Sequence, residues 1–364
     1  MGLVSYKMRD SQSVDFLNKG TSELDTIIKT LLNDNVLDPN LRNDILENIE
    51  AIIGPHESDW ISRNGKEHLV DYIVSRYKFQ RYPKMKRLES FPFHLLIEPT
   101  SICNLRCIMC FQSDHSFNTK EYMGMIDFGM FKDLVSQAVE NNCKFLTLAS
   151  RGEPTLHKEF GKMLEYCKGK FLELKINTNA TRLSKELSRE ILEAGVNVVV
   201  FSVDSFCKEE YERIRVGGDF GEVLGNIRQF CEMRLSKAKY HKTSTRVSGV
   251  FIDDRQSKAR FLGFWKDIVD TVIFSNVVPR WDTYNNSSMG YNKPCELLWE
   301  RMYIWYDGTC NPCDFDYKSK MKVGNVKDAS IRDIWLGKEY NHYRKMFLEG
   351  NRDQIRPCNR CNVY

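Results

Sequence analysis

Apolar residues recur at helical spacing through the first part of the chain. The segments "TSELDTIIKTLLND", "PNLRNDILENIEAIIG" and "KEHLVDYIVSRYKFQRY" all show this amphipathic pattern. Ser22 is expected to cap the first helix, and Gly54-Pro55 is expected to end the second. We therefore expect a helical accessory region over residues 1–88, which contains no cysteine and no catalytic motif.

From about residue 89 the pattern changes to short apolar runs that alternate with helical segments. Strands alternating with helices predict βαβ units and a parallel sheet, hence an α/β fold. Six such strands suggest a curled or partly closed barrel over residues 89–283, with functional groups at the carboxyl ends of the strands. The expected strands cover residues 93–98, 144–150, 171–178, 197–204, 245–253 and 271–277.

After residue 283 the alternation stops. The segment "YNNSSMGYNKP" is rich in turn-forming residues and is expected to be a linker or loop. Residues 284–364 look irregular and rich in cysteine, with too little periodic apolar sequence to form a large core alone. A bound metal could supply the missing stabilisation, so we expect a small metal-binding domain here.

Composition and charge narrow the class of protein. The chain has 364 residues, of which 42% are hydrophobic and 28% charged, as in ordinary globular proteins. The net charge of +4 is small and its basic residues are interleaved with acidic ones, which argues against a nucleic-acid partner. The chain shows no signal-peptide pattern and no long apolar run, so we expect a cytoplasmic protein that does not associate with membranes.

The twelve cysteines carry the clearest chemical signal. In a reducing compartment they are more readily metal ligands or buried apolar residues than disulfides. Cys103, Cys107 and Cys110 stand close together, directly after the first expected strand. Three thiolates leave one iron of a cubane cluster without a protein ligand, and such an open position admits a cofactor. The alternative is a zinc site completed by His94 or His115.

The cysteine loop resembles the C-x3-C-x2-C signature of the radical S-adenosylmethionine (SAM) superfamily, with Met109 where an aromatic residue is frequent. "ASRGEP" resembles the family's GGEP motif, with Arg151 in place of the first glycine, and "NTNATRL" its TNG-type segment. "FSVDS" resembles its S-x-D segment, while "YERIRVGGDFGEVLGNI" and "VSGVFI" resemble two further runs. The resemblance implies a partial (β/α)6 barrel of the radical SAM type. It also implies SAM contacts from Gly152, Glu153, Asn177, Asn179, Ser202 and Asp204, with Glu153 holding the ammonium group and Ser202 near the ribose.

The tail resembles the SPASM auxiliary-cluster domain and its shorter twitch form. The resemblance implies a second [4Fe–4S] cluster on Cys295, Cys313, Cys358 and Cys361, and it makes Cys310 a non-ligand because the family usually has an apolar residue there. The small number of cysteines favours the twitch form. The alternative is a zinc ribbon built on the pairs at 310/313 and 358/361, but residues 314–357 form a longer interval than the ~15–20 residues usual for zinc.

In this superfamily an electron from the cluster cleaves SAM to a 5′-deoxyadenosyl radical, which abstracts a hydrogen atom from the substrate. Resemblance to twitch-type aminocyclitol dehydrogenases implies oxidation of a small molecule, such as a sugar, nucleotide sugar or aminocyclitol. The auxiliary cluster would accept an electron, and flavodoxin or ferredoxin would supply the reducing electron. A peptide-modifying maturase, a sugar epimerase and a non-catalytic iron–sulfur protein stay open as alternatives. By position after the last two strands, the candidate bases are Asp253, Asp254, Arg280 and Asp282, whereas Lys175 receives no role.

Overall fold

A computed structural model describes residues 24–277, 283–285, 287 and 293–361. The described strands form one sheet in the order β6-β5-β4-β3-β2-β1-β7-β8-β9, in which β1 to β7 pair in parallel and β8 and β9 pair antiparallel. The sheet ends at β6 and β9, so the barrel is partial, and the predicted α/β fold is confirmed. The strands are β1 (His94–Ile97), β2 (Phe145–Leu148), β3 (Glu173–Thr178), β4 (Val198–Ser202), β5 (Ser244–Phe251), β6 (Thr271–Asn276), β7 (Arg301–Ile304), β8 (Thr309–Asn311) and β9 (Gly324–Asn325).

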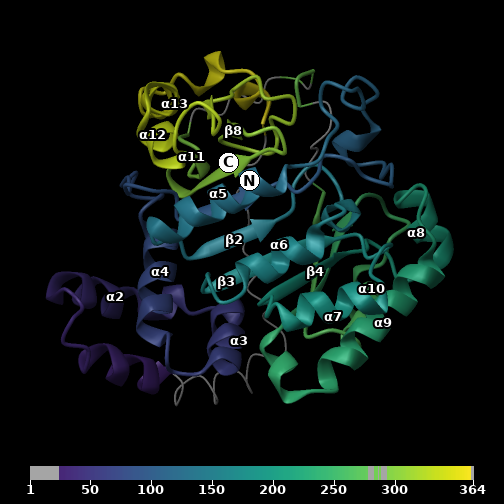
Figure 1. Cartoon of the computed structure of the whole chain (residues 1–364), viewed down its shortest axis with the longest axis horizontal. Coiled ribbons are helices and arrows are strands. Elements are labelled where there is room, and N and C mark those ends of the chain that lie inside the picture. Colours follow the sequence, from purple (N-terminus) through teal and green to yellow (C-terminus); the bar gives the residue numbers. More distant parts are fainter. Residues whose placement is uncertain (1–23, 278–282, 286, 288–292, 362–364) are drawn as a thin grey trace.

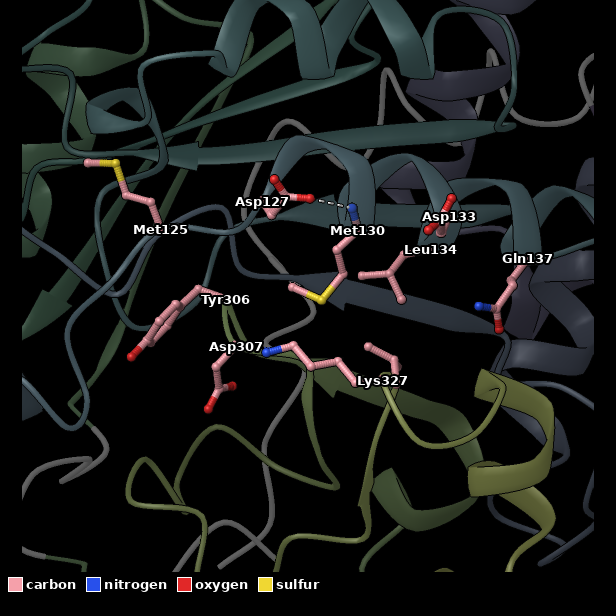
Figure 2. Close-up of a pocket in the computed structure, with 10 residues that line it drawn as sticks. Met125, Asp127, Met130, Asp133, Leu134, Gln137, Tyr306, Asp307 and Lys327 are labelled. Carbon is pink, nitrogen blue, oxygen red and sulfur yellow. Dashed lines mark hydrogen bonds between the residues drawn. The ribbon is translucent and has the colours of Figure 1, made fainter.

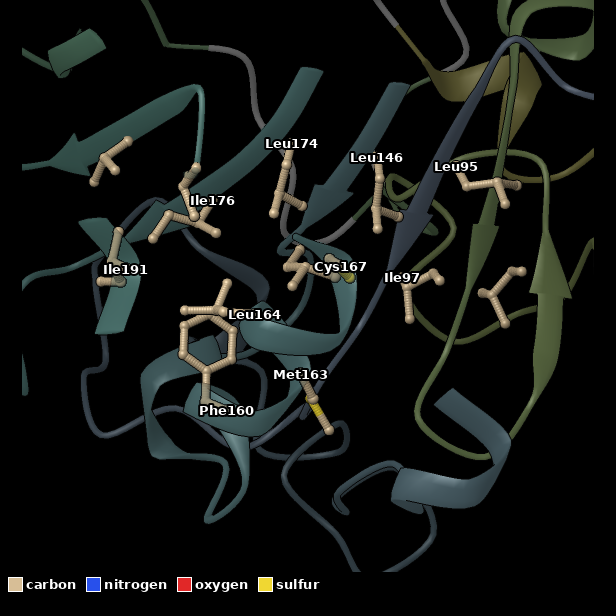
Figure 3. Packing of buried hydrophobic residues seen from close by; sticks show 14 of the residues in the cluster. Leu95, Ile97, Leu146, Phe160, Met163, Leu164, Cys167, Leu174, Ile176 and Ile191 are labelled. Atoms are coloured by element: carbon tan, nitrogen blue, oxygen red, sulfur yellow. The ribbon is translucent and has the colours of Figure 1, made fainter. Parts of the chain in front are cut away.

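One face of the sheet is covered by the helices that connect the strands (Figure 1). These are α5 (Phe128–Glu140), α6 (Phe160–Cys167), α7 (Lys185–Glu193), α9 (Phe220–Leu235) and α10 (Lys258–Trp265), with α8 (Lys208–Ile214) in the loop after β4. Figure 3 shows Leu146, Leu174 and Ile176 of the sheet packing towards Phe160 and Leu164 of α6. Because side chains alternate along a strand, the residues between these apolar positions point to the opposite face.

Burial follows the same alternation. In β3, Leu174 and Ile176 are buried in the main core, whereas Lys175 and Asn177, which alternate with them, are only half-buried. In β5, Val247 is buried and Arg246 is half-buried. The face away from the helices therefore stays partly accessible to solvent and carries polar side chains.

The N-terminal region forms its own apolar cluster at the amino ends of the strands. It contains a helical segment at residues 24–32 and the helices α2 (Pro39–Ile52), α3 (Pro55–Asn64) and α4 (Leu69–Arg81), so the expected helical region is confirmed over its described part. Trp60 donates a hydrogen bond of 2.9 Å from Nε1 to the carbonyl oxygen of Leu172, just before β3. The proposed cap, Ser22, lies outside the described residues.

Helix α3 was not expected from the apolar pattern. Gly54 caps its start and Pro55 occupies the first turn, where a proline lacks only an N–H group that would have no helical partner. The expectation that Gly54-Pro55 only ends a helix is therefore incomplete, since the same pair also begins one.

The C-terminal segment is more regular than its sequence suggests. Strand β7 pairs with β1 in register and extends the main sheet. The helices α11 (Leu297–Glu300), α12 (Ile331–Leu336) and α13 (Lys338–Leu348) follow in this region. Trp335, Tyr340 and Phe347 are buried in the same core cluster as the strands, so the expectation of an irregular tail is wrong. The elements are too short to give a readable apolar period.

Candidate functional site

The loop with Cys103, Cys107 and Cys110 leaves the carboxyl end of β1 and is fixed on both sides by hydrogen bonds. At its start, the Thr100 hydroxyl donates to the carbonyl oxygen of Gly124 over 2.8 Å. Further on, the N–H groups of Arg106 and Ile108 donate to the carbonyl oxygens of Val216 and Ile214 over 2.8 and 3.0 Å. The three thiols are thus presented by a restrained backbone.

The thiol sulfurs accept hydrogen bonds from their surroundings. The Leu105 N–H donates to Cys103 Sγ and the Gln112 N–H to Cys110 Sγ, each over 3.5 Å. Hydrogen bonds of this kind tune the sulfur ligands of iron–sulfur clusters. Burial raises the pKa of Cys103 to about 12, so a nearby cation is needed to hold its thiolate.

Within the part of the chain that the structure describes, no three or more histidine, cysteine, aspartate or glutamate side chains are already arranged around a metal position. The donor set nevertheless fits an iron–sulfur cluster. It offers three thiols on one short loop, two of which accept backbone N–H donors, and it leaves one coordination position free for a cofactor.

The "RGEP" segment after β2 packs directly on the start of the cysteine loop. A Cβ atom on Gly152 would come within 2.3 Å of the carbonyl oxygen of Thr100 and 2.5 Å of that of Ile102. The next residue, Glu153, donates its N–H to the Ile102 carbonyl over 2.9 Å. Only glycine fits at position 152, so this segment helps to set the position of the cysteine loop.

The buried Glu153 carboxylate holds two neighbouring segments together. Its Oε1 accepts from the hydroxyls of Thr155 and Thr178, each over 2.7 Å, and its Oε2 accepts from the N–H of Asn179 over 2.7 Å. Asn179 in turn donates from Nδ2 to the side-chain oxygen of Asn104 over 3.0 Å, beside Cys103. Burial raises the pKa of Glu153. These bonds shape the site, and a direct contact between Glu153 and the SAM ammonium group stays a prediction.

The other predicted cofactor contacts lie along the same rim. Asn177 is on the solvent-accessible face of β3, and its Oδ1 is buried with no hydrogen-bond partner among the described residues. Ser202 is half-buried at the end of β4. Asp204 is buried, and it forms an ion pair of 2.7 Å with Arg215. Their contacts with SAM stay predictions.

Arg215 connects two parts of the site that the sequence did not join. Its Nη2 contacts the Asp204 carboxylate, and its Nη1 donates to Cys107 Sγ over 3.7 Å. The guanidinium thus places a positive charge beside the sulfur of a predicted cluster ligand, Cys107. The only sequence signal was that Arg215 lies in the "YERIRVGG" run.

A buried ion pair joins the cysteine loop to the C-terminal segment. Arg151 Nε and Nη2 donate to the two oxygens of Glu98 over 2.8 and 2.6 Å, and both side chains are almost fully buried. Arg151 Nη1 also donates to the Tyr317 carbonyl over 2.9 Å, and the Tyr306 N–H donates to Glu98 over 3.3 Å. The departure from the GGEP motif at Arg151 therefore has a structural role that the sequence did not reveal.

Cys295 and Cys361 influence the pKa of two other tail cysteines, Cys313 and Cys358. Burial and the nearby Cys295 and Cys361 raise the pKa of Cys358, and burial, Asp314, Cys295 and Cys361 raise that of Cys313. The four cysteines therefore lie within electrostatic range of Cys295 and Cys361, and their role as a ligand set stays a prediction. Cys310 is different, because it is fully buried on β8, with Sγ 3.8 Å from the Gly308 carbonyl oxygen.

The candidate bases differ in their ion pairs and in their exposure to solvent. Asp253, just after β5, forms ion pairs of 2.9 Å with Arg213 and 2.7 Å with Arg255. Hydrogen bonds from Arg255 lower the pKa of Asp253, which makes it a weaker base. Asp254 is exposed in the same turn. Arg280 and Asp282 lie outside the described residues.

A separate pocket of about 620 Å³ lies between α5 and the C-terminal segment (Figure 2). Its lining includes Met130, Tyr306, Asp307 and Lys327, while Asp127 caps α5 by accepting from the Met130 N–H over 2.9 Å. None of the predicted site residues lines this pocket.

Among the described helices, none combines the length and the apolar character needed to cross a membrane.

The fold and the cysteine loop define a radical SAM enzyme. The family model "Radical SAM superfamily" matches residues 97–252, and the SPASM model, "Iron-sulfur cluster-binding domain", matches residues 295–362. The chain belongs to the radical SAM superfamily and carries a C-terminal SPASM domain. These domains imply a [4Fe–4S] cluster, an auxiliary cluster and SAM as cofactors. The shorter twitch form stays a prediction.

Two relatives align with this chain over most of its length and over most of their own length. The chain is 26% identical over 302 residues to a tungsten-containing aldehyde ferredoxin oxidoreductase cofactor-modifying protein from Pyrococcus furiosus, covering 69% of this chain and 83% of that protein. It is 22% identical over 333 residues to a cysteine-type anaerobic sulfatase-maturating enzyme from Clostridium novyi, covering 74% and 85%.

Solved structures show the same fold. BtrN in complex with AdoMet and 2-DOIA aligns with a TM-score of 0.51 and 20% identity, covering 74% of this chain and 92% of BtrN. SuiB from Streptococcus suis bound to S-adenosylmethionine aligns with a TM-score of 0.57 and 15% identity, covering 84% and 87%. At these identities the likeness concerns the fold alone.

Proposed function

We propose that this enzyme oxidises a polar small molecule, such as a sugar, nucleotide sugar or aminocyclitol, and consumes one SAM per turnover. The observation that carries this proposal is the placement of the SPASM domain. Its strand β7 is paired with β1, the strand that leads into the cysteine loop. A second redox centre held by the tail cysteines would therefore be built onto the same sheet as the SAM site.

When bound, the clusters and SAM would supply one-electron chemistry: abstraction of a hydrogen atom from the substrate, and an acceptor for one further electron. For an alcohol, loss of the hydrogen atom, a proton and this electron gives a ketone, so the oxidation is by two electrons. The protein's part is to position the substrate and accept the proton. Asp254 and Asp282 are the candidates for accepting that proton, because the ion pairs of Asp253 make it less suitable. Arg280, which is always protonated, could only orient the substrate.

The polar, partly accessible face of the sheet supports a small polar substrate. Asn177, Ser202 and Ser248 lie on this face, opposite the helix-packed side. We propose that flavodoxin or ferredoxin provides the reducing electron.

Peptide modification is the second candidate, favoured by the similarity to the sulfatase-maturating enzyme along 74% of this chain. Against it, the described N-terminal helices pack their apolar residues into their own cluster at the amino ends of the strands. That arrangement leaves them less free to act as a peptide-docking element.

The test is turnover by the anaerobically reconstituted and reduced enzyme with panels of sugars, nucleotide sugars and aminocyclitols. We expect one 5′-deoxyadenosine for each ketone formed, measured by mass spectrometry. A redox-neutral product or a modified peptide would show that the proposed reaction is wrong. Absence of 5′-deoxyadenosine in every condition would argue against SAM cleavage itself.

A further inference from the structure

Two cationic side chains lie on the accessible face of the sheet. Lys175 is on β3 and Arg246 is on β5, and both are half-buried. Their chain neighbours Leu174, Ile176 and Val247 are buried in the core on the helix side. The two cations therefore share the opposite face, the one that carries the polar side chains of the proposed substrate site.

The strand register brings these two side chains close together. Lys175 pairs with Val198 of β4, and Arg246 pairs with Val200 of the same strand. Two strands separated by one other lie about 10 Å apart, a gap that the long side chains of lysine and arginine can close from both sides. The β4 residues between them, Val198 and Val200, cannot neutralise either charge.

The carboxylates nearby are already engaged. Glu57 accepts from Arg76 Nε over 2.8 Å, Glu300 contacts Arg301, and Glu173 Oε2 lies 2.8 Å from His56 Nε2. These pairs are all at the amino ends of the strands. Glu173 is the carboxylate that acts on both Lys175 and Arg246, but it is shared with His56 and Arg76, so positive charge is in excess there.

Neither cation is fully partnered. Within the described chain, Lys175 forms no ion pair and no hydrogen bond. Arg246 reaches only His56, with 3.4 Å between Nη2 and the ring Nδ1, and its buried Nε has no hydrogen-bond partner. Burial and the charge of Arg246 lower the pKa of Lys175 to about 8, although the nearby Glu173 carboxylate acts in the opposite direction. Two half-buried cations that share one carboxylate, itself bonded to His56, destabilise a fold, so such a pair is typically kept for a ligand.

The polar neighbours extend from this pair towards the cysteine loop. Asn177 is level with Arg246, because both pair with Val200. One step nearer the carboxyl ends, Ser202 pairs with Ser248. A molecule whose anionic group lies between Lys175 and Arg246 can therefore extend past Asn177 and reach Ser202, a predicted SAM contact.

We propose that Lys175 and Arg246 bind an oxyanion of the substrate, either a phosphate group or a carboxylate. This inference rests on the proposed function, since it narrows the polar small molecule to an anionic one. Two hydrogen-bonding cations recognise both kinds of oxyanion, and a phosphate ester offers more acceptor oxygens than a carboxylate.

The experiment measures binding of sulfate and of acetate by isothermal titration calorimetry. The proteins are reconstituted wild type, Lys175→Met, Arg246→Met and, as matched control, Lys162→Met, which removes a 69% exposed lysine on α6. We expect wild type to bind sulfate, and each of the two inner-face substitutions to weaken binding about tenfold or more, as for loss of a charge-assisted hydrogen bond. Lys162→Met should bind as wild type does.

The outcomes separate the alternatives. Tighter binding of sulfate than acetate assigns a phosphate ester, and the reverse assigns a carboxylate. Wild type that binds neither anion, or inner-face variants that bind as wild type does, would overturn the proposal. If the methionine variants do not fold by circular dichroism, Lys175→Arg is tested in their place together with protection of wild-type Lys175 from acetic anhydride by sulfate, read by mass spectrometry. Absence of protection would also overturn it.

Failure here is distinguishable from failure of the proposed function. Formation of 5′-deoxyadenosine by the wild-type enzyme is measured without any added anion. Active SAM cleavage with no anion binding at these residues would refute only the oxyanion site, whereas anion binding without SAM cleavage would refute the proposed reaction.

Discussion

Replacing Arg151 by methionine should destabilise the protein more than any surface substitution of similar size. The change leaves the buried Glu98 carboxylate, which is 0% exposed, without the two guanidinium donors at 2.8 and 2.6 Å. Removing one partner of a buried ion pair typically costs about 3–5 kcal/mol, because the remaining charge stays buried and uncompensated. The backbone donors from Arg151 and Tyr306 remain, at 3.1 and 3.3 Å, and they bring our expectation to the lower end, about 3 kcal/mol.

The measurement is urea unfolding of reconstituted protein, followed by far-ultraviolet circular dichroism. The double variant Glu98→Gln/Arg151→Met removes both charges and should recover at least ~1 kcal/mol relative to Arg151→Met alone. The matched control is Arg255→Met, which removes a 69% exposed arginine from its ion pair with Asp253 and should cost less than ~1 kcal/mol.

The reasoning is refuted if Arg151→Met costs no more than Arg255→Met, or if the double variant is as unstable as the single one. Hydrogen exchange gives a second readout. Because Arg151 also donates to the Tyr317 carbonyl over 2.9 Å, its loss should speed exchange in the surrounding C-terminal segment. Unchanged exchange there would mean that the ion pair does not connect the two regions.

Three further predictions concern the cofactors and the anion site. Reconstituted protein should hold about eight irons per chain. Alanine at Cys103, Cys107 and Cys110 should remove about half of the iron and abolish SAM cleavage. Saturation near four irons with bound zinc would contradict the auxiliary cluster. Glu153→Gln should weaken SAM binding by ~1–3 kcal/mol in equilibrium dialysis, since it perturbs a buried carboxylate with three bonds of 2.7 Å, and unchanged affinity would make the motif match accidental. Sulfate binding should weaken as the pH rises through about 8, because Lys175, whose pKa is lowered to about 8, then loses its charge. The other charged groups around Lys175 are Arg246, Glu173, Arg301 and Arg76. The fall in sulfate affinity near pH 8 should be absent in Lys175→Arg, because arginine keeps its charge.

The sequence predicted the parallel sheet because its apolar runs have the length and spacing of buried strands. Strands β1 to β6 all fall within the expected ranges or within one residue of them. The cysteine loop was predicted as a metal site for a different reason. Thiols grouped in a short segment more often bind metals than form disulfides in a protein expected to be in a reducing compartment. In contrast, the pairing of β7 with β1 joins Arg301 to His94 across more than half of the chain, and no local pattern encodes such a contact.

Side chains that act through distant partners were missed for the same physical reason. Arg151 looked like a departure from a motif until Glu98 and Tyr317 were seen to surround it. The spacing of Lys175 between Leu174 and Ile176 does indicate a residue on the other face of the sheet, but it cannot show that Arg246 lies on that face too. Their closeness depends on the register of β3, β4 and β5. A charge that looks ordinary in the sequence can therefore become a binding group once the fold places it beside a second cation with only a shared carboxylate nearby, and the anion measurements test that inference directly.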